Sequence, residues 1–219
     1  MRIRVTHQRI TFALQFVLFL EVLAALWTGR WFTGFFTTLI IVVTFLPVLL
    51  ERRFRIHIPP ELQLLAIAFV FASLFLGEVR DYYSRFWWWD ILLHTSSGVL
   101  LGILGFLLVH IMNETERIQV HMKPGFVAFF AFLFALGIGA LWEIFEFAMD
   151  SLFGMNMQKP MLGDPSGLTD TMWDLIVDSL GALAISLLGW RYLKNPQQAS
   201  FLERWIAAFV ERNPRFFRK

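Results

Sequence analysis

Aspartate recurs at every fourth position in one apolar stretch near the end of the chain. Asp170, Asp174 and Asp178 open a segment that is otherwise mostly hydrophobic up to about Leu193. In a helix, residues four apart lie on one face, so these carboxylates would form a single acidic stripe. Ionisable groups inside an apolar helix are expensive, and they usually mark a functional site.

Two earlier apolar stretches carry polar residues at similar spacing. One contains Asp90 and His94, and the other contains Glu143, Glu146 and Asp150. Carboxylates with one imidazole and no thiolate suit hard or borderline divalent ions such as Mg²⁺, Mn²⁺, Fe²⁺ or Zn²⁺. We therefore predict a divalent-metal site, with enough ligands for two ions. Its candidate ligands are Asp90, His94, Glu143, Glu146, Asp150, Asp170, Asp174 and Asp178.

The composition indicates a membrane protein. Of the 219 residues, 57% are hydrophobic and 16% are charged, and the mean hydropathy is +0.60. The apolar residues come in long uninterrupted blocks, which is typical of an all-α, polytopic bundle of membrane-spanning helices. The chain has no cysteine, which excludes disulfides and thiolate sites. Its net charge of +2 gives no reason to expect a nucleic-acid partner.

Six stretches are long enough to span a membrane, and we predict that they form one domain over residues 1–195. Glu21 interrupts the first, so we expect a retained span rather than a cleaved signal peptide. The predicted spans are Ile10–Thr28, Trp31–Leu50, Leu62–Gly77, Phe86–Met112, Pro124–Met149 and Thr169–Leu193.

Basic residues orient these spans. Fifteen of the 19 Lys and Arg residues lie before the first span, in the loops after the second and fourth, or between Arg191 and the C-terminal end. The positive-inside rule then places both termini in the cytoplasm. The tail, residues 196–219, is basic, and its stretch 201–210 is amphipathic, so we predict a helix lying on the inner leaflet.

This orientation brings the three polar sets to one depth. His94, Glu143 and Asp174 would each lie roughly 8–12 Å below the outer ends of their helices, at about 1.5 Å per residue. Small residues continue the same faces inward, and they allow close helix packing in lipid. We expect the last three spans to pack together with their acids facing one another. The small residues are Gly98, Gly102, Ala135, Gly139, Gly181 and Ala182.

Each polar set also has a structural explanation. Asp170 or Asp90 could cap its helix, and His94 could be an ordinary hydrogen-bonded interior histidine. Glu146 and Asp150 could pair with basic residues at the interface. So many carboxylates in one low-dielectric layer nevertheless need compensation. A bound metal is the interpretation we favour, ahead of a proton-sharing network and a purely structural cluster.

The polar motifs resemble those of a known family. They are Asp90 to Gly98 (DILLHTSSG), Trp142 to Phe147 (WEIFEF) with Asp150, and Asp170-Thr171 through Asp174 and Asp178 to Gly181. In this respect the chain is similar to the YjdF-like family of bacterial inner-membrane proteins. The resemblance implies a multi-pass protein of the bacterial inner membrane and singles out the same residues. It supplies no substrate.

Two functions remain open. The first is a metal-dependent hydrolase of a membrane lipid or lipid-linked substrate, with Glu143 as catalytic base. The second is a divalent-cation or proton-coupled transporter or binding protein. The inner halves of the last three spans carry almost no polar side chains, which favours the hydrolase, because a transporter needs a path across the membrane. An accessory subunit of a membrane complex is a third interpretation.

Overall fold

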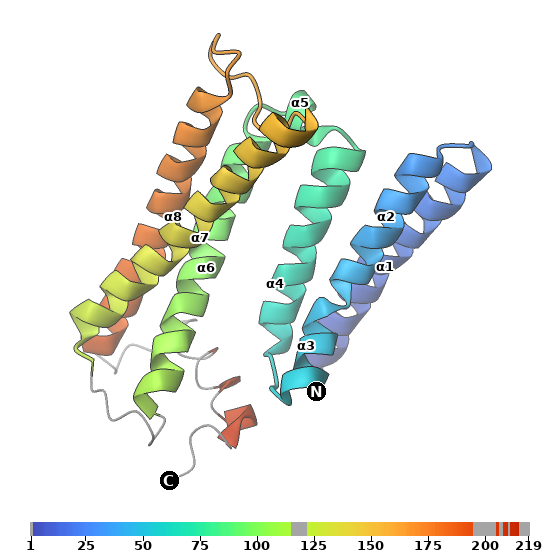
Figure 1. Ribbon diagram of the computed structural model, residues 1–219. Helices are drawn as coiled ribbons and strands as arrows, with labels where there is room; N and C mark the ends of the chain where they lie inside the picture. The colour runs from blue at the N-terminus through green and yellow to red at the C-terminus, as the bar shows by residue number, and fades with distance from the viewer. Residues whose placement is uncertain (1, 115–121, 195–204, 206–207, 210, 215–219) are drawn as a thin grey trace. The chain divides into compact units, whose positions relative to one another are not determined.

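The described part of the chain is helical, as predicted. The computed structural model describes residues 2–114, 122–194, 205, 208–209 and 211–214. Within these residues the extended structure is one isolated bridge between Met161 and Asp164. The helices (Figure 1) are α1 (Arg2–Trp27), α2 (Trp31–Thr44), α3 (Leu46–Phe54), α4 (Pro60–Val70), η1 (Phe71–Val79), α5 (Tyr82–Arg85), α6 (Trp89–Glu114), α7 (Pro124–Phe153) and α8 (Leu168–Lys194).

Six helical segments in the described residues are long and apolar enough to cross a membrane. They confirm a polytopic helical protein, and their ends lie within a few residues of the predicted ones. They are His7–Trp27, Trp31–Arg53, Pro60–Val79, Trp89–Val109, Pro124–Phe153 and Leu168–Lys194.

Two spans are interrupted in ways that hydropathy alone does not predict. The second consists of α2 and α3, which meet at Phe45. Pro47 lies in the first turn of α3 and lacks the N–H that would continue the bonding ladder of α2. The third span changes from α-helix to π-helix at Phe71. It reaches Val79 and is therefore longer than the predicted Leu62–Gly77.

The described chain falls into two compact units. One comprises Met1–Trp89 with Ala207–Asn213, and the other Asp90–Ile206 with Pro214–Lys219. The expectation of one domain over residues 1–195 stays a prediction. The helix expected over 201–210 lies largely outside the described residues.

The first unit contains a buried charge cluster. The Glu21 carboxylate of α1 is 5% exposed and pairs with Arg30 and Arg80, whose Nη2 atoms lie 3.4 and 2.5 Å from its two oxygens. Both guanidinium groups are about half exposed. The acid that interrupts the first span is therefore neutralised within its own unit, which makes a structural role sufficient for it.

The Asn213 side chain ties the end of the chain to the loop before α4. Its Oδ1 accepts the His57 N–H at 2.7 Å. Its Nδ2 donates to the carbonyl oxygens of His57 and Phe209, at 2.8 Å each. This amide is 2% exposed, so its hydrogen bonds satisfy groups that water does not reach.

The second unit contains α6, α7 and α8, packed at glycines. A Cβ atom added to Gly98 of α6 would collide with the Asp178 carbonyl of α8, and one added to Gly181 would collide with the Thr95 carbonyl. Gly105 of α6 contacts Ala131 of α7 in the same manner. The close packing expected from small residues is therefore confirmed.

Candidate metal centre

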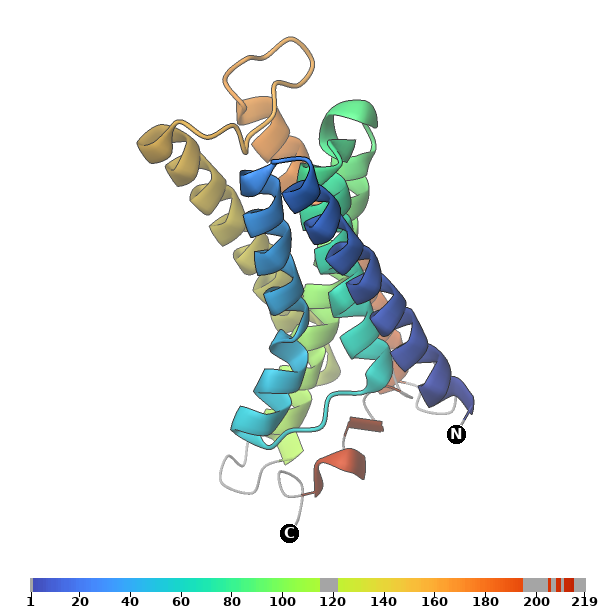
Figure 2. The ribbon, with the colours of Figure 1, turned by 90° about the vertical axis from the view of Figure 1, so that its right-hand side faces the viewer.

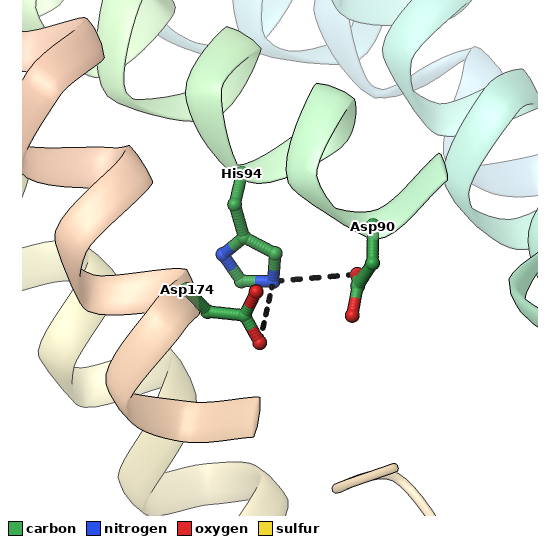
Figure 3. A group of neighbouring side chains, drawn as sticks. All are labelled: Asp90, His94 and Asp174. Carbon is green, nitrogen blue, oxygen red and sulfur yellow. Dashed lines mark ion pairs between the residues drawn. The ribbon is translucent and has the colours of Figure 1, made fainter. Parts of the chain in front are cut away.

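Three of the predicted ligands form one compact group. Asp90 and His94 lie one turn apart at the start of α6, and Asp174 faces them from α8 (Figure 3). The Nε2 atom of His94 is 3.6 Å from Asp90 Oδ1 and 3.8 Å from Asp174 Oδ2. A single ligand atom from each residue lies within 4.8 Å of the others. The last-span stripe and the Asp90–His94 pair therefore meet, as predicted.

The distances within this group suit a shared cation better than hydrogen bonds. Separations of 3.6 and 3.8 Å are too long for a hydrogen bond. Donor atoms about 2.0–2.2 Å from one tetrahedral ion lie roughly 3.3–3.6 Å from each other. The gap between Asp90, His94 and Asp174 is therefore close to the size that an ion would need.

The other nitrogen of His94 faces two more carboxylates. Its Nδ1 is 3.2 Å from Asp178 Oδ2 and 3.9 Å from Glu143 Oε1. The second oxygen of Asp178 accepts a hydrogen bond of 2.5 Å from the Ser97 hydroxyl. Ser97 lies one turn beyond His94 on α6. It belongs to the DILLHTSSG motif, but no function was predicted for it from the sequence.

Asp174 and Glu143 are buried with few hydrogen-bond donors among the described residues. Asp174 is 1% exposed and Glu143 is 3% exposed. Within the described residues neither oxygen of Asp174 has a hydrogen-bond partner, and the side chain close enough to donate to Glu143 is the Thr171 hydroxyl. Buried carboxylates normally have several donors, because an unsatisfied buried charge costs several kcal/mol. Asp174 and Glu143 therefore need a proton or a cation.

The remaining predicted ligands have other partners. Glu146 accepts the indole N–H of Trp142 at 2.8 Å. Asp150 accepts the backbone N–H groups of Met157 and Gln158, at 2.7 and 2.9 Å. These partners, an indole and two backbone N–H groups, differ from the basic residues considered above, and a ligand role for Glu146 and Asp150 stays a prediction.

Asp170 also holds the loop between α7 and α8. It accepts the Lys159 N–H at 2.6 Å, and the Gln158 side chain donates to Thr171 at 2.7 Å. Asp170 is the third residue of α8, so it lies in the first turn of the helix, where the dipole favours an acid, and not at the N-cap position that one structural explanation gave it. Figure 2 shows this loop beyond the ends of the two helices. Asp150 and Asp170 thus fix the loop at the end of the unit where Asp90, His94 and Asp174 lie.

Asp164 is the residue that stabilises the start of α8. It accepts the Ser166 N–H at 2.9 Å and the Thr169 N–H and hydroxyl at 3.0 and 2.8 Å. The hydrogen bond from the Ser166 hydroxyl, together with these three, holds the pKa of the Asp164 carboxyl well below its usual range, because all of them favour the ionised form. Its motif, an aspartate five residues before a threonine, was not recognised from the sequence.

Replacing Gly139 with alanine should disturb the centre without removing any ligand. A Cβ atom at Gly139 of α7 would lie 2.6 Å from Asp178 Oδ2, so the carboxylate would have to move away from His94. We expect Gly139→Ala to lower metal content and the thermal midpoint. Gly137→Ala on the same helix is the matched control, because nothing lies within 4 Å of its added methyl. Equal behaviour of the two variants would contradict this packing.

The fold and site together define a polytopic helical membrane protein with a buried carboxylate–imidazole group. Residues 7–195 match the family described as "Predicted membrane protein (DUF2238)", and the chain belongs to this family. An uncharacterised protein of Thermotoga maritima is 30% identical over 148 residues, which cover 67% of this chain and 71% of that protein. No solved structure matches the chain.

Proposed function

We propose that this protein is a metal-dependent hydrolase that acts on a membrane lipid or lipid-linked substrate at the outer leaflet of the bacterial inner membrane. The observation that carries the proposal is the pair of buried carboxylates, Asp174 and Glu143, on either side of His94, with no cationic partner other than His94 given for either one among the described residues. A divalent cation would compensate their charge. The YjdF-like assignment is part of this proposal and is consistent with the family membership.

The cation would be held by Asp90, Asp174 and the Nε2 atom of His94. Three protein ligands leave coordination positions open, which is characteristic of catalytic rather than structural sites. Oxygen and imidazole donors without sulfur suit Mg²⁺, Mn²⁺, Fe²⁺ or Zn²⁺. A divalent ion bound there would make water nucleophilic at neutral pH and would bind a phosphoryl or carbonyl oxygen of the substrate.

Glu143 is the residue we propose as general base. Glu143 lies outside the three-residue group, and its Oε1 is 3.9 Å from His94 Nδ1, so its carboxylate would be able to take a proton once a cation compensates the charge of the acids around His94. In the hydrolysis, the water oxygen forms a bond to phosphorus or carbon, and the bond to the leaving group breaks. Glu143 takes a proton from the water and then, as the acid, gives it to the oxygen of the leaving group, which restores the Glu143 carboxylate.

The packing below the centre favours an enzyme over a carrier. Between residues 99 and 109 of α6, 127 and 139 of α7, and 182 and 189 of α8, Ser186 is the one polar side chain. In this region Gly102 contacts Ile185, and Gly189 contacts the ring of Phe106. An ion leaving the centre toward the other end of these helices would cross closely packed apolar side chains, which is costly.

The orientation is open to a direct test, because the chain has no native cysteine. We expect cysteines placed at Ser166 or Asn156 to react with a membrane-impermeant maleimide applied to intact cells. Cysteines at Thr115 or Ser200 should react only after the membrane is opened. Labelling of Thr115 from outside would place the metal centre at the inner leaflet and would remove the basis for an outer-leaflet substrate.

The function itself is tested with purified protein in detergent. Elemental analysis should find a divalent metal that a chelator removes. The metal-loaded protein should release headgroup or phosphate from bacterial lipid extracts, and in proteoliposomes it should not move Zn²⁺ or Mn²⁺ across the bilayer. Metal-dependent ion uptake without any lipid product would instead establish the transporter.

A further inference from the structure

We propose that Arg30 and Arg80 bind the phosphate group of a membrane phospholipid, and that Glu21 holds their two guanidinium groups together for it. Arg30 directly precedes α2, Arg80 directly follows η1, and Glu21 lies near the end of α1. These residues belong to the first unit, whereas the group around His94 belongs to the second. The inference therefore goes beyond the proposed function and does not depend on a metal.

The charges of this cluster do not balance. One oxygen of Glu21 pairs with Arg30 and the other with Arg80, and within the described residues no second acid lies within ion-pair distance of either guanidinium. Asp81, which follows Arg80, instead accepts the Ser84 hydroxyl at 2.7 Å. Two guanidinium groups and one carboxylate leave one positive charge in excess. A phosphodiester carries one negative charge and would neutralise the cluster.

The two guanidinium groups have donors to spare. Arg30 Nε donates to the Thr28 hydroxyl at 3.0 Å, and one Nη atom of each arginine donates to Glu21. These bonds use fewer than half of the N–H groups that two guanidinium groups offer. Both side chains are about half exposed, so a ligand can reach the remaining donors. A guanidinium fits phosphate oxygens through two parallel hydrogen bonds.

The neighbouring helix ends favour an anion at the same place. α2 begins at Trp31 without a side-chain cap, so the N–H groups of its first turn and the positive end of its dipole lie next to Arg30. At the end of α1, the Ala24 carbonyl accepts the N–H and the hydroxyl of Thr28 and needs no guanidinium donor. A Cβ atom added to Gly29 would have nothing within 4 Å, so the turn beside Arg30 is open.

Exposed aromatic residues favour the phosphate of a lipid over a free phosphate ion. Trp27 ends α1 and Trp31 begins α2, and they are 90% and 70% exposed. Tryptophan is enriched at the depth of the lipid headgroups, where its ring contacts both the apolar chains and the polar layer. Further along the same two helices, Leu23 and Phe35 are exposed and offer an apolar surface for acyl chains.

The first experiment measures lipid binding to the full-length protein in a nonionic detergent, with a chelator present so that the result is independent of any metal. Native mass spectrometry counts the bound lipids. We expect phosphatidylglycerol to bind and a diacylglycerol glycolipid without phosphate not to bind. Inorganic phosphate should not displace phosphatidylglycerol, because it lacks the apolar part. Equal binding of the two lipids, or displacement by inorganic phosphate, would overturn the proposal.

The second experiment locates the bound lipid with single substitutions. Arg30→Gln and Arg80→Gln should each weaken phosphatidylglycerol binding about 10–100-fold, because each removes charged donors to the phosphate. Arg85→Gln is the matched control, because Arg85 is exposed, lies on α5 in the same unit and has no acid within ion-pair distance in the described part of the chain. It should bind within about fivefold of the wild type. Equal effects of all three substitutions would overturn the proposal.

A double variant keeps the test decisive if Arg80→Gln does not fold. Arg80→Gln alone leaves the buried Glu21 carboxylate with Arg30 as its remaining partner, whereas Glu21→Gln combined with Arg80→Gln removes one charge of each sign. The double variant keeps the single excess positive charge of the wild type but has one guanidinium for the phosphate. We expect the same loss of about 10–100-fold. Wild-type affinity in the double variant would show that charge alone suffices and would overturn the paired-arginine site.

Discussion

Asp174→Asn is expected to remove the bound metal while leaving the metal-free protein at least as stable as the wild type. The Asp174 carboxylate is 1% exposed and has no hydrogen-bond donor among the described residues, so in the absence of a metal its charge has only His94, 3.8 Å away, beside it. Replacing it with an isosteric amide removes that cost. The same change removes a ligand, and we expect a loss of affinity larger than the roughly 100-fold that a positioning residue can cause.

The measurement is thermal unfolding of both proteins, with chelator and with added Zn²⁺ or Mn²⁺. The wild type should gain about 2.7 kcal/mol at a free-metal concentration 100 times its Kd, and Asp174→Asn should gain nothing. Asp81→Asn is the matched control, because Asp81 is exposed and its left-handed backbone (φ 59°) suits asparagine equally well. A metal-dependent shift in Asp174→Asn equal to that of the wild type would refute the centre.

The helices, and the face of α8 that carries its aspartates, could be predicted from the sequence because both depend on simple periodicities. Apolar runs of membrane-spanning length predicted six spans, and spacing four predicted that Asp174 lies on the same face as Asp178. The glycines at positions 98 and 181 predicted the close approach of α6 and α8. Each of these features follows from local sequence alone.

The roles of the individual acids could not be predicted in the same way. The sequence offered eight equivalent ligands, whereas the structure separates Asp90, His94 and Asp174 from acids that bind a loop backbone. The bonds to Met157 and Lys159 depend on the path of the loop, which no periodicity predicts. The division between Asp174 and Asp178 depends on which nitrogen of His94 each one faces, and that is a matter of side-chain conformation.

Glu143→Gln is expected to keep the metal and to lose most of the hydrolytic turnover. The amide has the shape of the carboxylate but does not accept a proton from water, and general-base assistance typically contributes about 10²–10⁴-fold. Glu143 lies outside the three-residue group, so metal content should change little. The predicted signature is therefore a fall in kcat at nearly constant metal stoichiometry, which separates the role of a base from that of a ligand.

The assay follows headgroup or phosphate release from lipid extracts by metal-loaded wild type, Glu143→Gln and Glu61→Gln. Glu61 lies in the first turn of α4, in the other unit of the chain, so its variant controls for the chemical change. Unchanged turnover in Glu143→Gln would exclude this residue as the base. If Glu143→Gln loses both its metal and its turnover, Glu143 is a ligand, because an amide oxygen binds a divalent cation more weakly than a carboxylate does. The role of base would then have to belong to another carboxylate near His94.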